Sequence, residues 1–182
     1  MTSTRIASTA VEPGNQRGNM DLDFKTPSAL GRHAHFWHVG IACHSLEAAM
    51  SDVGNAFGLR WTPVASDTLP GLHTPDGPAN WSARRVQSIG GLVPFELLQG
   101  SPGSTWDTPA SEPVLTHHLA YWSEDVGADV LALEKEGWSV EIDMLDDDGN
   151  PVTFAYMTRP GDIRVELVDV SRRPAYLDLV GK

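Results

Sequence analysis

Two glutamates stand in the middle of apolar, strand-like segments, and each has a matching histidine. Glu96 lies in "PFELLQG" and Glu166 in "RVELVDV", while His38 lies in "WHVGIA" and His118 in "HHLAYW". An ionised carboxylate on a buried face costs free energy unless it is paired or binds a metal. Two imidazoles and two carboxylates make a metal site of intermediate hardness. The sequence therefore predicts a site for one divalent ion (Fe, Mn, Co, Ni or Zn) with these four residues as ligands.

Such a ligand set also predicts a type of chemistry. Four protein ligands on an octahedral ion leave two adjacent positions open, which suits a substrate with two neighbouring oxygens. A metal in this arrangement acts as a Lewis acid and stabilises an enolate or a polarised carbonyl. The expected partner is therefore a small carbonyl compound.

The elements that must position these residues occur twice along the chain. From His35, the strand-like "FWHVGIAC" is followed by the helical "LEAAMSDVGNAF", with Ser45 as its N-cap and Gly58 as its end. From Leu115, "THHLAYWS" reads as a strand and "DVGADVLALEKE" as a helix that Gly137 stops. A further strand follows each helix, "RWTPV" in the first copy and "WSVEI" in the second.

Each copy also closes in the same way. "WSARRVQSIGGLVPFELLQG" and "PVTFAYMTRPGDIRVELVDV" each predict two strands around a turn, so strand, helix, strand and hairpin occur twice. If each copy curls into half a barrel, pseudo-twofold symmetry brings the two histidines and two glutamates together on one axis. The predicted organisation is a disordered N-terminal tail 1–33, a first module 34–100, a linker 101–114, a second module 115–170, and a C-terminal tail or short helix 171–182.

With these motifs in order, the chain resembles the vicinal oxygen chelate superfamily, which includes glyoxalases, methylmalonyl-CoA epimerases, extradiol dioxygenases and bleomycin-resistance proteins. The resemblance covers residues 34–170 and implies an α+β fold, in which two βαβββ modules form an open mixed-sheet barrel. It maps the metal ligands onto His38, Glu96, His118 and Glu166. It further implies that a metal-bound glutamate is catalytic, Glu166 in the first place and Glu96 as its counterpart, by shifting a proton next to a chelated carbonyl.

The resemblance favours a glyoxalase-like lyase or isomerase among the branches of the superfamily. Epimerases carry a further carboxylate on the strand before the "ELL" strand, and "NWSARRVQS" holds no acid at the corresponding place. A non-catalytic small-molecule binding or self-resistance protein of the same fold is the main alternative. An extradiol-type dioxygenase ranks lower, because that branch binds iron through two histidines and one glutamate.

Composition limits the partners. The chain has 182 residues and a net charge of −11, so it should repel nucleic acid and anionic membranes. Its one cysteine, Cys43, excludes an internal disulfide framework and a thiolate zinc cluster. No apolar stretch predicts a membrane span or a secretory signal, and we expect a cytoplasmic protein. A homodimer is compatible with the resemblance, since the superfamily pairs modules within or between chains.

Other residues are candidates for places around the same site. We expect His117 to lie behind the ligands or at the surface rather than to bind the metal. An apolar pocket would be lined by Trp122, Phe154 and Tyr156, and an anionic substrate group would be bound by Arg84, Arg85 or Arg164.

Overall fold

The structure is a computed structural model, and it describes residue 30 and residues 34–149 and 151–180. The first module contains β1 (His35–Cys43), α1 (Leu46–Phe57), β2 (Arg60–Trp61), β3 (Ala65–Thr74), β4 (Gly77–Ile89) and β5 (Phe95–Gly100). The second contains β6 (Val114–Ser123), α2 (Val126–Lys135), β7 (Ser139–Leu145), β8 (Pro151–Thr158) and β9 (Arg164–Asp169). A 3-10 turn, η1 (Val170–Arg172), and helix α3 (Arg173–Val180) follow.

Both module helices begin and end where the sequence predicts. The Ser45 hydroxyl accepts a hydrogen bond from the Ala48 N–H at the start of α1, and Gly58 ends that helix with φ 66°. Asp125 caps α2 in the same way, and Gly137 follows that helix with φ 85°. These caps fix where each chain segment turns back toward its own sheet.

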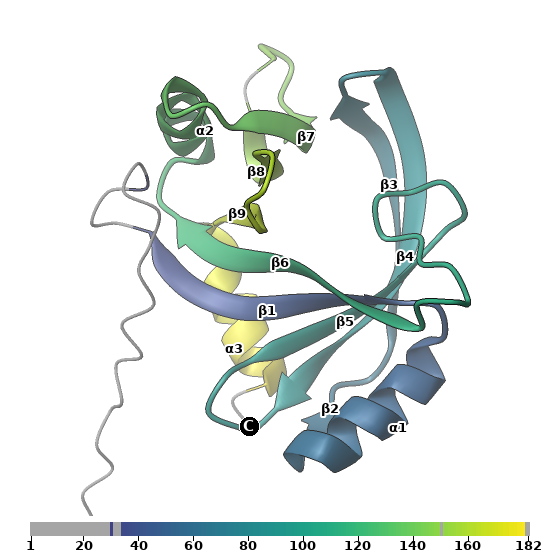
Figure 1. The fold of residues 1–182 in the computed structure, drawn as a ribbon. Coiled ribbons are helices and arrows are strands. Elements are labelled where there is room, and N and C mark those ends of the chain that lie inside the picture. Colours follow the sequence, from purple (N-terminus) through teal and green to yellow (C-terminus); the bar gives the residue numbers. More distant parts are fainter. Residues whose placement is uncertain (1–29, 31–33, 150, 181–182) are drawn as a thin grey trace, which may run out of the picture.

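The strands form a single mixed ring, as Figure 1 shows. Their order is β4-β3-β7-β8-β9-β6-β1-β5, and β4 also pairs with β5, which closes the ring; β2 pairs with the end of β4. The two modules meet along two seams. β1 and β6 run antiparallel over the length of β1, whereas β3 and β7 share the single register pair His73↔Asp143. The α+β class and the two paired modules are confirmed. We expected an open barrel, but the β3–β7 pairing bridges the ring at the weaker seam.

The first module departs from the predicted pattern after α1. "RWTPV" supplies only the two-residue β2, and the strand equivalent to β7 is β3, which the sequence did not reveal. The reason is local: β3 contains Pro70 and Gly71, and the latter has φ 70° at an irregularity in the pairing with β4. Proline and glycine inside a strand mask its alternating pattern, because they mark bulges and edges.

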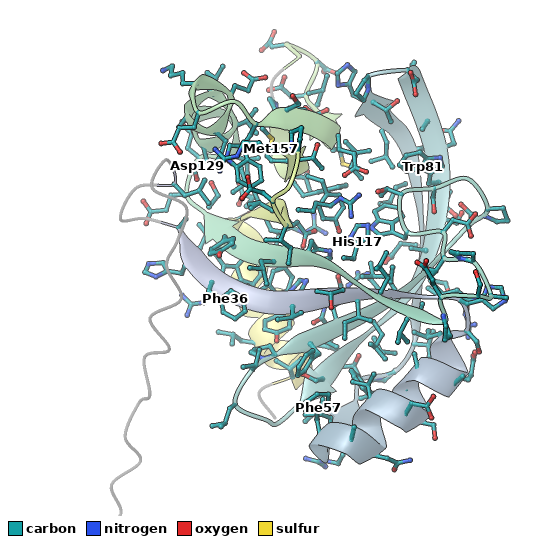
Figure 2. The ribbon with its side chains drawn as sticks, viewed as in Figure 1. Phe36, Phe57, Trp81, His117, Asp129 and Met157 are labelled. Atoms are coloured by element: carbon teal, nitrogen blue, oxygen red, sulfur yellow. The ribbon has the colours of Figure 1, made fainter. Side chains whose placement is uncertain are left out.

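Side chains pack on both sides of the sheet, and Figure 2 labels Met157 on the side that α2 covers. Leu30 is fully buried in the same cluster, although it belongs to the segment expected as a disordered tail. The rest of residues 1–33 lies outside the described residues. The predicted short C-terminal helix is present as α3. Within the described part of the chain, no helix is both long and apolar enough to cross a bilayer.

Candidate metal centre

His38, Glu96, His118 and Glu166 meet inside the ring, and all four residues are buried. They lie on β1, β5, β6 and β9, which are adjacent strands around the longer seam between the modules. One ligand atom of each residue lies within 4.8 Å of the ligand atoms of the other three. The structure therefore brings together every metal ligand that the sequence predicted.

The distances between these atoms suit one ion. His38 Nε2 lies 2.9 Å from His118 Nε2, 3.4 Å from Glu96 Oε2 and 3.5 Å from Glu166 Oε2. His118 Nε2 lies 3.1 Å from Glu166 Oε2 and 3.9 Å from Glu96 Oε2. With metal–ligand bonds of about 2.0–2.2 Å, neighbouring ligand atoms stand about 3 Å apart and opposite ones about 4 Å. The measured separations fall in that range.

Gly40 makes space for one of the ligands. It pairs with Glu96 on one side of β1 and with His118 on the other. A Cβ at residue 40 would lie 1.9 Å from Cε1 of the His118 ring. The glycine in "WHVGIA" is therefore required by the close approach of that imidazole and not by an unusual backbone conformation.

His117 orients the ring of His118. Its Nε2 lies 3.0 Å from the Thr105 carbonyl oxygen, which only accepts hydrogen bonds, so Nε2 carries the proton. In a neutral imidazole Nδ1 is then an acceptor, and it lies 2.9 Å from Nδ1 of His118. His118 therefore donates through Nδ1 and directs the lone pair of Nε2 at the cluster. Metal-binding histidines commonly have their second nitrogen held in this way.

Both of these histidines are uncharged in this environment. Burial lowers the pKa of His117 to about 3, and His118 and Arg164 act in the same direction. Burial and then His38 hold the pKa of His118 well below its ordinary value. Of the two positions expected for His117, the one behind the ligands is correct, because its ring is buried against His118.

Glu96 is held firmly in its ionised form. Gln87 Nε2 donates to Glu96 Oε1 over 2.5 Å, and Arg85 Nη1 lies 3.8 Å from the same oxygen. Burial raises the pKa of the Glu96 carboxyl, but His38, Arg85 and His118 outweigh it, so the pKa lies below its ordinary value. One carboxylate oxygen is thus anchored, and the other, Oε2, faces the histidines.

Glu166 is less constrained. Burial, and then the charge of Glu96, raise its pKa to about 8 against the opposing effect of His38. Its Oε2 is buried and makes no hydrogen bond to any described residue, although His118 Nε2 is 3.1 Å away. The Tyr156 hydroxyl is its hydrogen-bonding neighbour, and burial keeps the pKa of that phenol well above 10, its ordinary value. The two repeat-related glutamates therefore have different surroundings.

The difference originates at one pair of equivalent residues. Gln87 stands opposite Glu96 in the β4–β5 pairing, and Tyr156 stands opposite Glu166 in the β8–β9 pairing. In this stretch the sequence indicated the lack of an acid and a role for the two arginines, and it predicted no role for Gln87. Aligning the two hairpins on their glutamates would have identified it.

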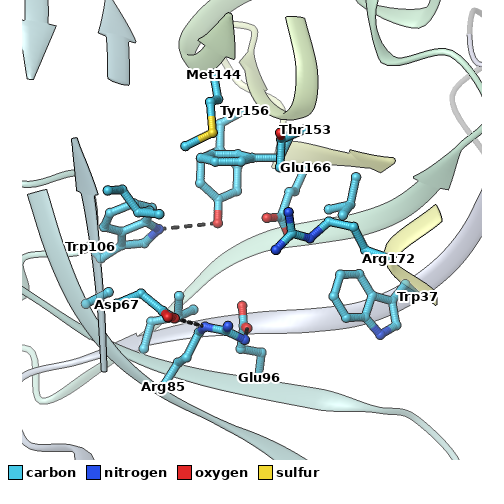
Figure 3. Close-up of a pocket in the computed structure, with 15 residues that line it drawn as sticks. Trp37, Asp67, Arg85, Glu96, Trp106, Met144, Thr153, Tyr156, Glu166 and Arg172 are labelled. Carbon is cyan, nitrogen blue, oxygen red and sulfur yellow. Dashed lines mark hydrogen bonds and ion pairs between the residues drawn. The ribbon is translucent and has the colours of Figure 1, made fainter. Parts of the chain in front are cut away.

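The two glutamates line a cavity of about 280 Å³, which Figure 3 shows. Phe154 and Tyr156 line it, as predicted from the sequence. Trp122 does not line the cavity; its ring stacks on Trp37 with centroids 3.9 Å apart, and Trp37 lines the cavity in its place. Trp106, from the segment expected as a linker, donates from Nε1 to the Tyr156 hydroxyl over 3.3 Å.

Of the arginines expected to bind an anion, only Arg85 reaches this cavity. Arg84 forms an ion pair with Glu47 outside the ring, at 2.5 Å. Arg164 pairs with Glu141 and donates to the His117 carbonyl over 3.2 Å. A fourth arginine, Arg172 in η1, also lines the cavity, and nothing in the sequence had marked it.

The donor set itself agrees with a bound divalent cation. Two imidazoles and two carboxyl groups direct their ligand atoms at one point, which is unfavourable unless a cation or a shared proton lies between them. The buried Oε2 of Glu166 has no hydrogen bond among the described residues. Ligands of these types are common to Fe²⁺, Mn²⁺, Co²⁺, Ni²⁺ and Zn²⁺, so the cluster could hold any of these ions.

A family model described as the glyoxalase/bleomycin resistance protein/dioxygenase superfamily matches residues 37–156, well over half of the chain. The chain belongs to this superfamily. The match includes β1 and β6, with both histidines, and β5 with Glu96, whereas β9 with Glu166 lies beyond its end. No curated protein sequence matches the chain.

The chain is similar to several solved structures at low sequence identity. A hypothetical protein, BH1468 from Bacillus halodurans C-125, is 14% identical with a TM-score of 0.52, over 75% of this chain and 94% of that one. Methylmalonyl-CoA epimerase from Mycobacterium tuberculosis is 16% identical with a TM-score of 0.49, over 78% of this chain and 91% of that one. A mutant of 4-hydroxymandelate synthase from Streptomyces coelicolor is 16% identical with a TM-score of 0.49, over 79% of this chain and 51% of that one.

Proposed function

We propose that this protein is a divalent-metal-dependent lyase or isomerase of the glyoxalase-like kind. It takes a small carbonyl substrate with two neighbouring oxygens and moves a proton through an enolate-like state. The observation that carries the proposal is that the four buried ligands converge beside a pocket into which both glutamates open. His38, Glu96, His118 and Glu166 would hold the ion, which supplies Lewis-acid stabilisation of negative charge on the substrate oxygen.

Glu166 is the proposed proton carrier. Its carboxylate accepts the proton from the carbon next to the carbonyl and returns it to the neighbouring position, so the substrate is rearranged without a change in oxidation state. The contacts favour Glu166 over Glu96, because Gln87 and Arg85 restrain an oxygen of Glu96. The Tyr156 hydroxyl lies beside Glu166 and would orient it during the transfer. A positioned base of this type contributes about 10²–10⁴-fold to the rate.

The decisive measurement is metal analysis of purified protein together with proton exchange. We expect about one equivalent of a transition metal, and deuterium exchange from solvent into one of a panel of α-hydroxy ketones, 2-oxo compounds and acyl thioesters. His118→Ala removes a central ligand and should abolish both. His35→Ala, an exposed histidine at the start of β1, is the matched control and should change neither.

Glu166→Gln separates catalysis from binding, because the amide keeps an oxygen that can bind a metal but cannot accept the proton. The exchange rate should fall by about 10²-fold or more, with substrate still bound. The alternative, a protein that sequesters a small molecule, requires the opposite results. That reading would be supported by metal-free protein whose ligand affinity is the same in wild type and His118→Ala. Oxygen consumption with catechols would support the dioxygenase alternative instead.

A further inference from the structure

The two arginines that line the pocket, Arg85 and Arg172, differ in their hydrogen-bond and ion-pair partners. Arg85 already pairs with two carboxylates, because its Nε donates to Asp67 Oδ2 over 2.6 Å and its Nη1 lies 3.8 Å from Glu96 Oε1. Its positive charge therefore already balances carboxylates of the pocket itself. A ligand would have to compete with two carboxylates to use this guanidinium.

Arg172 lines the same pocket, but it does not pair with a carboxylate of any described residue. Its side chain is exposed, and no hydrogen bond or ion pair joins it to any residue that the structure describes. In Figure 3 its guanidinium points into the pocket from the side of Trp37, opposite Trp106 and Asp67. An arginine offers up to five N–H donors in a planar fork suited to carboxylate and phosphate groups.

The backbone of Arg172 is held at the pocket rim. It directly follows β9, which carries Glu166, and the Asp169 side chain caps η1 by accepting from the Ser171 N–H over 2.7 Å. Helix α3 is fastened beside it, because the Tyr176 ring packs edge-on against Trp37 with centroids 4.8 Å apart. The position of the Arg172 backbone beside the pocket is thus set by the fold, although its side chain is exposed.

The charge balance of the pocket also favours an anion. Asp67, Glu96 and Glu166 contribute three negative charges when ionised, and Arg85 and Arg172 contribute two positive charges. A divalent cation at the quartet adds two more, which leaves the pocket with a net positive charge in a chain of net charge −11. Most of the other residues that line the pocket are apolar and include Trp37, Trp106 and Phe154.

We propose that the ligand of this pocket is a compact, largely apolar carbonyl compound with an anionic oxyacid group at the end away from its chelating oxygens, and that Arg172 binds this group. The inference rests on the proposed function, because the quartet holds the other end. The cavity of about 280 Å³ limits the ligand to a small molecule. Arg172 is then a specificity-determining residue and takes no part in moving the proton.

Inert chelators provide the test. Benzohydroxamate presents two neighbouring oxygens to a metal, and its 3-carboxy, 4-carboxy and 4-phosphono derivatives add an anionic group at the far end. Each is titrated into metal-loaded protein by calorimetry and by tryptophan fluorescence. We expect at least one anionic derivative to bind about tenfold more tightly than benzohydroxamate. The carboxy and phosphono arms distinguish between a carboxylate and a phosphate in the natural ligand.

The variants are Arg172→Gln and Arg172→Glu, with Arg173→Gln, an exposed neighbour outside the pocket lining, as the matched control. Arg172→Gln should remove the tenfold preference and leave benzohydroxamate binding unchanged. Arg172→Glu should make the anionic derivative bind more weakly than benzohydroxamate, while Arg173→Gln should retain the wild-type preference. Because Arg172 has no partner among the described residues, these variants should fold normally, which circular dichroism can verify.

The possible failures are distinguishable. If benzohydroxamate binds, depends on His118, and gains nothing from any anionic group, the anion subsite is refuted and the metal centre stands. A preference that persists in Arg172→Gln would also overturn the role of this arginine. If no hydroxamate binds the metal-loaded protein, both this inference and the proposed function fail together.

Discussion

At the scale of single residues, the candidate metal centre depends on a position that carries no candidate ligand. Gly40 separates Glu96 from His118 across β1, and any side chain there would occupy the place of the imidazole. The first module holds glycine at this point, whereas the equivalent residue of the second module is the buried Ala120. One missing methyl group thus lets four side chains converge.

Gly40→Ala should therefore displace His118 and abolish metal binding. The clash involves ring atoms at 1.9–2.3 Å from the new Cβ, and the ring is packed on its other side against His117 and Tyr156. We expect overpacking to lower the free energy of unfolding by about 1–3 kcal/mol. Metal content and thermal unfolding measure the two effects. Gly127→Ala is the control, because its nearest contact would be an ordinary 3.6 Å; normal metal content in Gly40→Ala would contradict the steric argument.

Cys43 gives a pH dependence that is separate from the metal centre. Burial, and then Glu47, raise the pKa of its thiol to about 11, and Sγ–H donates to the Leu98 carbonyl over 3.3 Å. The folded thiol stays protonated above pH 9 while the unfolded thiol ionises, so stability is present below about pH 9 and is lost as the pH rises toward 11.

Between pH 9 and 11 the free energy of unfolding of the wild type should fall by up to about 2 kcal/mol more than that of Cys43→Ala. Urea unfolding at each pH measures this difference. The same burial should make the thiol of the folded protein slow to react with a disulfide reagent at pH 8. Parallel pH curves for the two proteins would show that the thiol does not titrate in this window.

At the scale of elements, the two seams between the modules are unequal. The β1–β6 seam carries the two histidines of the candidate metal centre, whereas β3 and β7 meet at the register pair His73↔Asp143. There His73 Nδ1 lies 3.0 Å from Asp143 Oδ1, with the carboxylate buried and the imidazole half exposed. Burial raises the pKa of the Asp143 carboxyl, and the hydrogen bond and charge of His73 act in the opposite direction.

Asp143→Ala should loosen the β3–β7 seam without disturbing the other one. Amide hydrogen exchange should accelerate in β3 and β7 and stay unchanged in β1 and β6, because local opening follows the weakest contacts. Asp162→Ala serves as the control, since it removes the exposed ion pair with Arg159 in a turn away from the seam. Equal exchange in β3 for the two variants would mean that backbone pairing alone holds the ring closed.

At the scale of the whole molecule, the core of the second module extends to a residue outside both modules. Leu30 is fully buried in the cluster formed by α2 and the sheet, together with Tyr121 and Met157. Leu30 is therefore part of the folded core, whereas the composition of residues 1–33 predicted a tail.

Leu30→Ala should lower the free energy of unfolding by about 2–4 kcal/mol, because it leaves a cavity among side chains that cannot fully collapse. Chemical denaturation measures the change. Leu92→Ala, at a side chain 75% exposed, should alter stability by less than about 0.5 kcal/mol. Similar small effects for both substitutions would place Leu30 outside the cooperative core.

The sequence by itself determined the repeat, both module helices with their caps, and the four residues that converge as candidate ligands. These features are local or periodic: a cap lies within a few residues of its helix, and a glutamate inside an apolar strand is visible without knowledge of its neighbours. The duplication then related His38 to His118 and Glu96 to Glu166, which is a long-range inference that local patterns alone do not allow.

Only the tertiary structure decided which residues surround that quartet and how the two glutamates differ. Gln87, Trp106 and Arg172 come from three separate segments, and each has an ordinary sequence context. Their roles arise because ring closure brings together strands that are far apart in the chain, and the pairing register selects the facing side chain. Burial and electrostatic interaction act through space, so the unequal pKa values of Glu96 and Glu166 follow from packing that symmetry in the sequence does not encode.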